Sequence, residues 1–220
     1  MKGKLNYLAI SMAVLLLAMP LLEKGTIPTI LTSFAISAVC FFSVYAVSQN
    51  RRNLIIALSI GIPMFISTWV GLFLPQPSLI LTFVNAVFSV GFFVFTASIL
   101  FSFVFTSARV NGNVLYATVT IYMLIGGIFS SVYFLIESIF PGSFVLNSAV
   151  SSKTAVGIVD LIYFSFVTLT TLGYGDITPV GAQVKIFAVV EAIIGVMYLA
   201  IIISRLVGLH IVHASKTAGN

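Results

Sequence analysis

Residues 160–176 read DLIYFSFVTLTTLGYGD, and this segment decides the fold. Residues 160–170 are mostly apolar and helical in pattern, but they are too few to cross a bilayer, which takes about 20 residues. Glycine-rich backbone follows at residues 171–176. Irregular backbone is tolerated at membrane depth only where it is buried in protein or lines water. The segment therefore predicts a re-entrant loop beside an aqueous path.

The whole chain has the composition of a membrane protein. Of its 220 residues, 60% are hydrophobic and 7% are charged, whereas a soluble domain carries about 25% charged residues. A soluble fold of this size could not cover its surface with polar side chains. The same composition excludes a nucleic-acid-binding protein, a secreted disulfide scaffold and a disordered chain.

Six apolar runs have about the length of a membrane-spanning helix. We expect them at 5–22, 28–48, 54–74, 79–106, 114–139 and 184–208. Helices are favoured over barrel strands because barrel strands would alternate over about ten residues. Lys and Arg in short loops mark the cytoplasmic side. Both termini are predicted to be cytoplasmic because this places most basic residues inside, namely Lys2, Lys4, Arg51, Arg52, Arg109, Arg205 and Lys216.

The sequence TTLGYGD, preceded by YFSFVTL and flanked by a spanning helix on each side, resembles the filter of potassium channels. The resemblance covers about residues 114–208. In that family, backbone carbonyls replace the water shell of K+. The resemblance implies that K+ is bound at the carbonyls of Thr171, Leu172, Gly173 and Tyr174, followed by Gly175, and that the Thr171 side-chain oxygen completes the innermost site. No cofactor is expected besides the permeant K+.

The residue types of this filter suit the role. A run of carbonyls that all point into the pore needs backbone angles of alternating sign, and Gly173 and Gly175 can take positive φ at low cost. Leu172 stands where the family often has valine, but only its carbonyl would bind the ion, so we expect selectivity to survive. One chain supplies one filter strand and the family filter takes four, which predicts a homotetramer.

Four more residues are predicted to support the filter. The pore helix is expected to end near Thr170, with the negative end of its dipole toward the central cavity. Asp160 can cap free N–H groups at the start of that helix. Asp176 lies at the pore mouth, where four copies would concentrate cations. Several family members have tryptophans at the positions of Tyr163 and Phe164, and we expect Tyr163 to hydrogen-bond to Asp176.

The last spanning helix carries two notable residues. Gly195 has the spacing of the family's gating-hinge glycine, and it could allow either a bend or close helix packing. Glu191, one turn earlier, is an ionisable residue at membrane depth. It either faces the cavity and tunes cation occupancy or is buried against pore-helix hydroxyls such as Ser165 or Thr170, and the second is favoured. By family analogy, the residues that face the cavity or its inner mouth are Val196, Leu199, Ile203 and Val207.

Residues 1–110 are predicted to form a four-helix transmembrane module, residues 111–210 the pore domain, and residues 211–220 a short cytoplasmic tail. Voltage sensors carry repeated arginines, but residues 79–106 contain neither Arg nor Lys. The module is therefore not expected to be a conventional voltage sensor.

Together these observations predict an all-α membrane protein that conducts K+ passively and is not an enzyme. A weakly selective cation channel and a non-conducting regulatory subunit of another channel remain as alternatives. Membrane lipids and further copies of the chain are the expected partners, with no nucleic acid and no organic substrate. The plasma membrane is the expected location.

Overall fold

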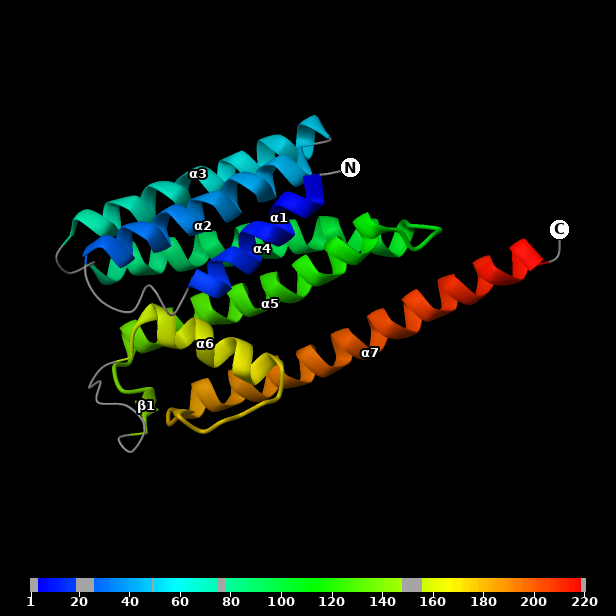
Figure 1. Cartoon of the computed structure of the whole chain (residues 1–220). Coiled ribbons are helices and arrows are strands. Elements are labelled where there is room, and N and C mark those ends of the chain that lie inside the picture. Colours follow the sequence, from blue (N-terminus) through cyan, green and yellow to red (C-terminus); the bar gives the residue numbers. More distant parts are fainter. Residues whose placement is uncertain (1–3, 19–25, 49, 75–77, 148–155, 219–220) are drawn as a thin grey trace.

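The computed structural model describes residues 4–18, 26–48, 50–74, 78–147 and 156–218. Helices make up most of these residues, and two short strands complete the described elements (Figure 1). In chain order the elements are α1 (Lys4–Ala18), α2 (Thr26–Val47), α3 (Arg51–Phe73), α4 (Leu79–Thr106), α5 (Gly112–Ile139), β1 (Phe144–Leu146), α6 (Ile158–Leu169), β2 (Ile177–Pro179) and α7 (Ala182–Ala218).

Four of the described helices are long and apolar enough to cross a membrane. They are α3 over Arg51–Gly71, α4 over Leu79–Thr106, α5 over Gly112–Ile139 and α7 over Ala182–Leu209, in agreement with four of the predicted spans. α1 has 15 residues, or about 22 Å of helix, which is less than the ~30 Å hydrocarbon core. In α2, the described apolar stretch Ser33–Val47 is also shorter than a membrane span. The six-span topology therefore stays a prediction.

Polar side chains fix where three of the long helices begin. The side-chain oxygen of Asn50 accepts from the Arg52 amide at 3.0 Å and starts α3. Ser78 and Asn111 cap α4 and α5 in the same way. Such caps satisfy amides that have no partner within the helix. In an otherwise apolar chain, they mark the helix starts.

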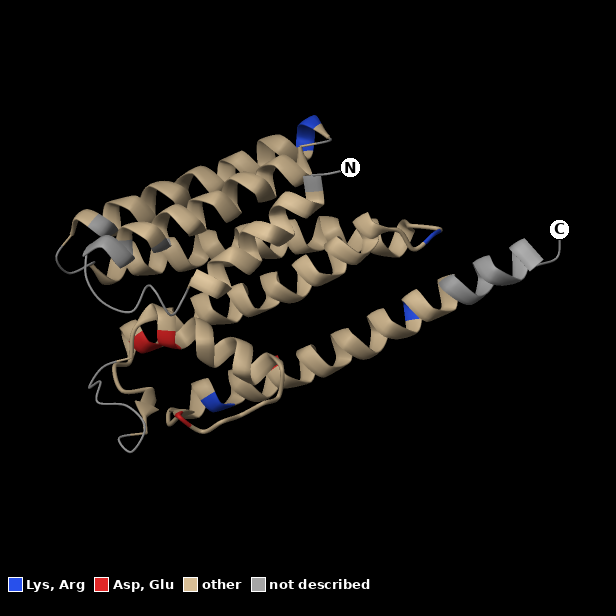
Figure 2. Cartoon of the chain, viewed as in Figure 1, with Lys and Arg blue, Asp and Glu red and all other residues tan. Residues whose placement is uncertain are grey.

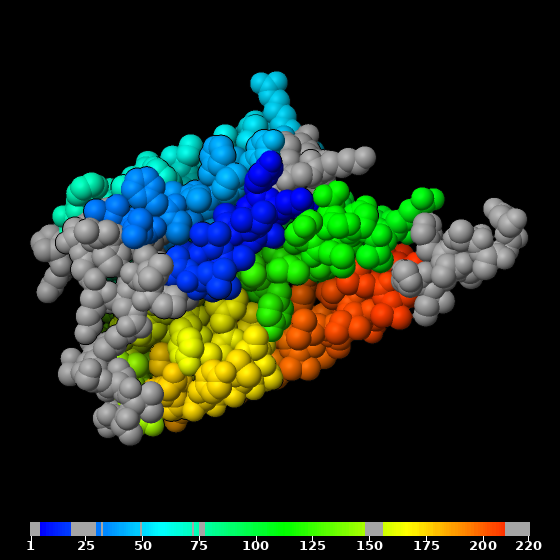
Figure 3. Space-filling model, in the orientation of Figure 1, coloured from blue at the N-terminus to red at the C-terminus, as the bar shows by residue number. Residues whose placement is uncertain are grey.

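The helices pack into one connected bundle. α4 lies along α5 and α3, and α1 packs on α2 and α5 (Figure 3). A single apolar core runs from Leu8 on α1 through Phe92 on α4 and Leu124 on α5 to Ile202 on α7. The predicted domain boundary at residue 110 falls in the loop between α4 and α5, but this core continues across it.

α6 is the element that positions the candidate site. It has 12 residues and packs between α5 and α7. From its C-terminal end the chain turns back through an irregular segment to β2 and the start of α7 (Figure 1). β2 pairs antiparallel with β1, with Val145 opposite Thr178. This pairing ties the returning segment to the chain that follows α5.

Candidate functional site

Residues 171–175, here called the filter strand, have alternating backbone geometry. Three residues at every second position have positive φ: Thr171 at 59°, Gly173 at 56° and Gly175 at 76°. The sequence predicts this for the two glycines. Thr171 was not anticipated, because positive φ is strained for a β-branched residue. Strain of this kind concentrates at functional sites.

The amides of the filter strand are tied back to the pore helix. The Thr171 amide donates to the Thr168 carbonyl at 2.9 Å, and the Leu172 amide donates to the Val167 carbonyl at 2.9 Å. Among the described residues, the filter-strand carbonyls accept no hydrogen bond. All five residues are exposed within the single chain. The backbone oxygens are therefore the groups left to bind a cation.

Gly195 lies directly against the C-terminal end of the pore helix. A Cβ placed on Gly195 would stand 2.1 Å from the Leu169 carbonyl oxygen. The Tyr122 hydroxyl on α5 donates to the same oxygen at 3.1 Å. Of the two roles predicted for Gly195, close helix packing is the one that this geometry supports.

Glu191 is fully buried and joins three helices. The Tyr133 hydroxyl on α5 donates to its Oε2 at 2.5 Å, and the Ser165 hydroxyl on α6 lies 2.5 Å from its Oε1. Ser165 also lies within hydrogen-bond distance, at 2.8 Å, of the Gly126 carbonyl on α5. Thr170 instead donates to the Phe166 carbonyl of its own helix at 2.6 Å. The described contacts therefore place Glu191 behind the pore helix.

The outer end of the filter strand is held from two sides. Partial burial, followed by interactions with the Asp176 carboxylate, raises the pKa of the Tyr163 phenol to about 12. The two side chains are thus near enough to interact, and the hydrogen bond between them stays a prediction. On the other side, the Asp176 carbonyl accepts from the Asn147 amide at 2.8 Å. Phe164 cannot donate a hydrogen bond, and it packs instead between the rings of Tyr133 and Phe144.

Two acidic residues brace the chain around the pore helix. Asp160 accepts from the Gly157 amide at 2.9 Å, which caps the start of α6. Glu137 at the end of α5 accepts from the amides of Gly142 and Phe144, at 2.9 and 3.1 Å. These contacts hold the segment that leads to β1. Glu137 lacks any sequence signal for this role.

The inner helix α7 packs on its own chain by one face only. Val184, Glu191, Tyr198 and Ile202 are buried on that face. The predicted cavity-facing residues lie elsewhere on the helix and are exposed within the single chain, namely Val196, Leu199, Ile203 and Val207. Figure 1 shows α7 extending beyond the other helices at its C-terminal end.

Tyr122 and Tyr133 are the main site residues that the sequence analysis missed. They lie three turns apart on α5, and both donate hydrogen bonds toward the pore-helix region. Their signal in the sequence is weak, because a tyrosine in an apolar helix is usually part of the core or the interface. Only the crossing of α5, α6 and α7 reveals their partners.

Comparisons with known proteins point to the same region. Residues 113–209 match the family model described as "Ion channel". The Arabidopsis thaliana protein "Two-pore potassium channel 5" is 48% identical over 50 residues, which are 23% of this chain and 12% of the relative. "Two pore potassium channel c" of Oryza sativa subsp. japonica is 37% identical over 67 residues, or 30% of this chain and 14% of the relative.

The match with a bacterial relative covers a larger share of that relative. "Protein LctB" of Bacillus caldotenax is 33% identical over 86 residues, which are 39% of this chain and 62% of the relative. The chain thus covers less than two thirds of each of these curated relatives. No solved structure matches the chain. The family match runs from α5 to α7, and over part of this region the chain is similar to two relatives that are named potassium channels.

Proposed function

We propose that the chain forms a K+-selective channel in which carbonyls of the filter strand replace the water around the ion. The observation that carries this proposal is the positive φ at residues 171, 173 and 175. Alternating backbone signs turn successive carbonyls toward the same side of a strand. A strand of this kind can therefore present a ladder of oxygens to a dehydrated cation.

The proposal requires four copies of the chain around one pore. The exposed filter strand and the exposed apolar surface of α7 both support assembly, because neither is covered within the single chain. On α7, Val196, Leu199 and Ile203 form one stripe, and Ile186, Ile193 and Met197 lie on another side. One stripe would line the cavity, and the other would pack against a neighbouring copy.

We assign no conventional voltage sensing to the helices before α5. α4 contains no Lys or Arg, so this helix has no charge of its own to move in the membrane field. Basic residues occur at the start of α3, in the α4–α5 loop and in the second half of α7, and Lys185 lies near the start of α7, where the notional outer side would be (Figure 2). Most of these positions support the proposed orientation with both termini in the cytoplasm of a plasma membrane. The proposed activity is passive, without catalytic chemistry.

Reconstitution of the purified full chain in liposomes tests the function. We expect a K+ flux well above the Na+ flux, with block by Ba2+. Equal fluxes would favour the weakly selective channel, and no flux at all would favour the non-conducting subunit. Chemical crosslinking in the same liposomes should give a fourfold assembly.

A matched pair of glycine substitutions tests the filter strand itself. Gly173 and Gly142 both have positive φ, at 56° and 87°, and neither has a neighbour within 4 Å of an added Cβ. Alanine should strain the backbone at both positions by about 1 kcal/mol. Only Gly173→Ala should lower the K+/Na+ flux ratio. The same ratio in both variants would contradict the assignment.

A further inference from the structure

A cavity of about 360 Å³ lies between the first four helices and the pore unit. Its walls come from α1 to α5, and residues Ile162 and Phe166 of α6 form part of its lining. Volumes of this order are typical of sites for small organic ligands. Any occupant would touch the pore helix that leads into the filter strand.

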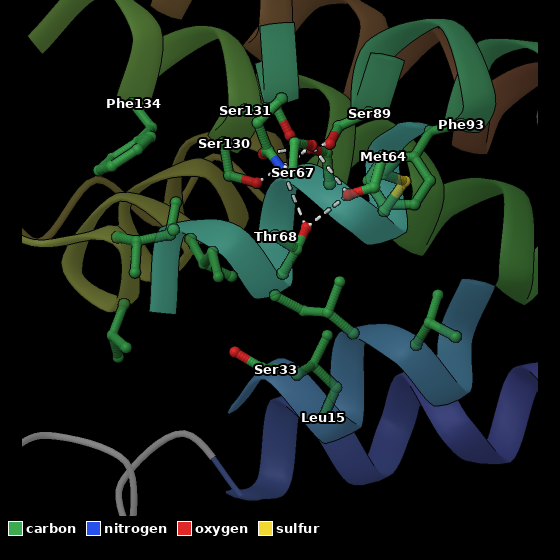
Figure 4. Close-up of a pocket in the computed structure, with 18 of the residues that line it drawn as sticks. Leu15, Ser33, Met64, Ser67, Thr68, Ser89, Phe93, Ser130, Ser131 and Phe134 are labelled. Carbon is green, nitrogen blue, oxygen red and sulfur yellow. Dashed lines mark hydrogen bonds between the residues drawn. The ribbon is translucent and has the colours of Figure 1, made fainter. Parts of the chain in front are cut away.

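Most of the polar groups of the cavity lie together on one side. Figure 4 shows the hydroxyl groups of Ser67, Thr68, Ser89, Ser130 and Ser131 on α3, α4 and α5, across the cavity from Leu15 on α1 and Ser33 on α2. None of the described residues that line the cavity is charged. The site therefore combines an apolar body with one polar wall and suits a neutral ligand.

Three polar side chains on α3 and α4, those of Ser67, Thr68 and Asn85, already donate their hydrogen atoms to neighbouring groups. The Asn85 amide donates to Ser67 at 2.9 Å and to Thr68 at 2.8 Å. Both hydroxyls in turn donate to the Met64 carbonyl, each at 2.9 Å. Asn85 Oδ1 has only a long contact of 3.5 Å with Ser89. Asn85 Oδ1 is thus an acceptor with only this long contact, whereas the hydrogen atoms of Ser67, Thr68 and the Asn85 amide are already in use.

The α5 part of the wall has the same property. The hydroxyls of Ser130 and Ser131 donate to the Gly127 carbonyl, at 3.0 and 2.9 Å. Their oxygen lone pairs remain available, because a hydroxyl can accept as well as donate. A ligand that donates a hydrogen bond would pair with these oxygens.

We propose that the cavity binds a neutral aliphatic alcohol, with its alkyl body between α1, α2 and α6 and its hydroxyl group donating to the wall formed by Asn85, Ser130 and Ser131. An anionic or cationic headgroup is disfavoured because, within the part of the chain that the structure describes, no side chain of opposite charge lines the cavity. An ether of the same length is disfavoured because it cannot donate a hydrogen bond. This binding does not depend on K+ conduction.

Photolabelling of the full chain in liposomes tests the proposal. The probe is a dodecanol analogue with a diazirine in its alkyl chain, and the labelled residues are mapped by mass spectrometry. We expect labels on residues that line the cavity. We also expect 1-dodecanol to compete at a concentration about two- to tenfold lower than 1-methoxydodecane, the effect of one neutral hydrogen bond. Labels that avoid the cavity would overturn the site, and equal competition would overturn hydroxyl recognition.

A pair of serine variants locates the polar wall. The double variant S130A/S131A should abolish the preference for the alcohol over the ether. Ser138→Ala is the matched control, because Ser138 also donates to a carbonyl of its own helix, that of Phe134 at 2.7 Å, but does not line the cavity. An unchanged preference in the double variant would overturn the role of these serines. If the double variant does not fold, the competition on the unaltered chain still decides the proposal.

Discussion

The Cα of Gly195 on the inner helix lies against the carbonyl of Leu169, the last residue of the pore helix. A Cβ at position 195 would stand 2.1 Å from that oxygen, a distance that backbone atoms cannot accept. The end of the pore helix therefore rests on α7 at a position that has no side chain. This contact links the position of the inner helix to that of the filter strand.

Gly195→Ala should push α7 away from the pore helix. We expect a loss of about 1–3 kcal/mol in stability, as for other overpacked cores, and a reduced K+ flux. Thermal unfolding in detergent and liposome flux are the measurements. Gly208→Ala is the control, because Gly208 lies on the same helix with nothing within 4 Å of an added Cβ. An unchanged Tm and flux for Gly195→Ala would show that the helices can separate freely here.

Glu191→Gln should leave K+ flux and Ba2+ block nearly unchanged. An amide oxygen can accept from Tyr133, and the amide N–H can donate to Ser165 while the Ser165 hydroxyl donates to Gly126. Glu191→Leu should instead leave the buried Tyr133 hydroxyl without its partner, at about 1–3 kcal/mol, while Ser165 keeps the Gly126 carbonyl. Thermal unfolding and flux distinguish the two variants. Equal damage from Gln and Leu would mean that the carboxylate itself is required.

Tyr163→Phe should loosen the outer end of the filter strand. The substitution removes the hydroxyl that interacts with Asp176 and keeps the ring. We expect a severalfold lower K+/Na+ flux ratio in liposomes with little change in Tm, since Tyr163 is partly exposed. Tyr116→Phe on the exposed face of α5 is the control. A selectivity equal to that of the unaltered chain would show that the backbone contacts suffice.

Arg205 in the second half of α7 connects this helix to the C-terminal end of α4. It donates to the Phe105 carbonyl at 2.6 Å, and its guanidinium carbon lies 5.4 Å from the centre of the Phe105 ring. Arg205→Lys should cost about 1 kcal/mol, because lysine loses the planar contact with the ring. A double-mutant cycle with Phe105→Leu, followed by thermal unfolding, measures the interaction energy between Arg205 and the Phe105 ring. Arg109→Lys in the exposed loop is the control. Additive effects would mean that the two side chains do not interact.

Apolar length and glycine placement predicted much of the architecture. Four predicted spans agree with the structure. A helix that crosses lipid must satisfy its own backbone groups, so such helices can be recognised in the sequence as continuous apolar runs. The short pore helix and the capping contact of Asp160 were predictable because both depend only on residues that are close together in the sequence. The first predicted span, 5–22, stays a prediction, because residues 19–22 lie outside the described residues.

The sequence by itself determined the apolar helices, the order of pore helix and filter strand, and the two glycines that take positive φ. These are local properties, set by residue type and spacing along one segment. Only the tertiary structure decided the partners of Glu191, the close approach at Gly195 and the strained φ of Thr171. Each of these depends on how α5, α6 and α7 cross, because residues 26 to 80 positions apart in the chain meet there, as Ser165 and Glu191 or Tyr198 and Thr118 do.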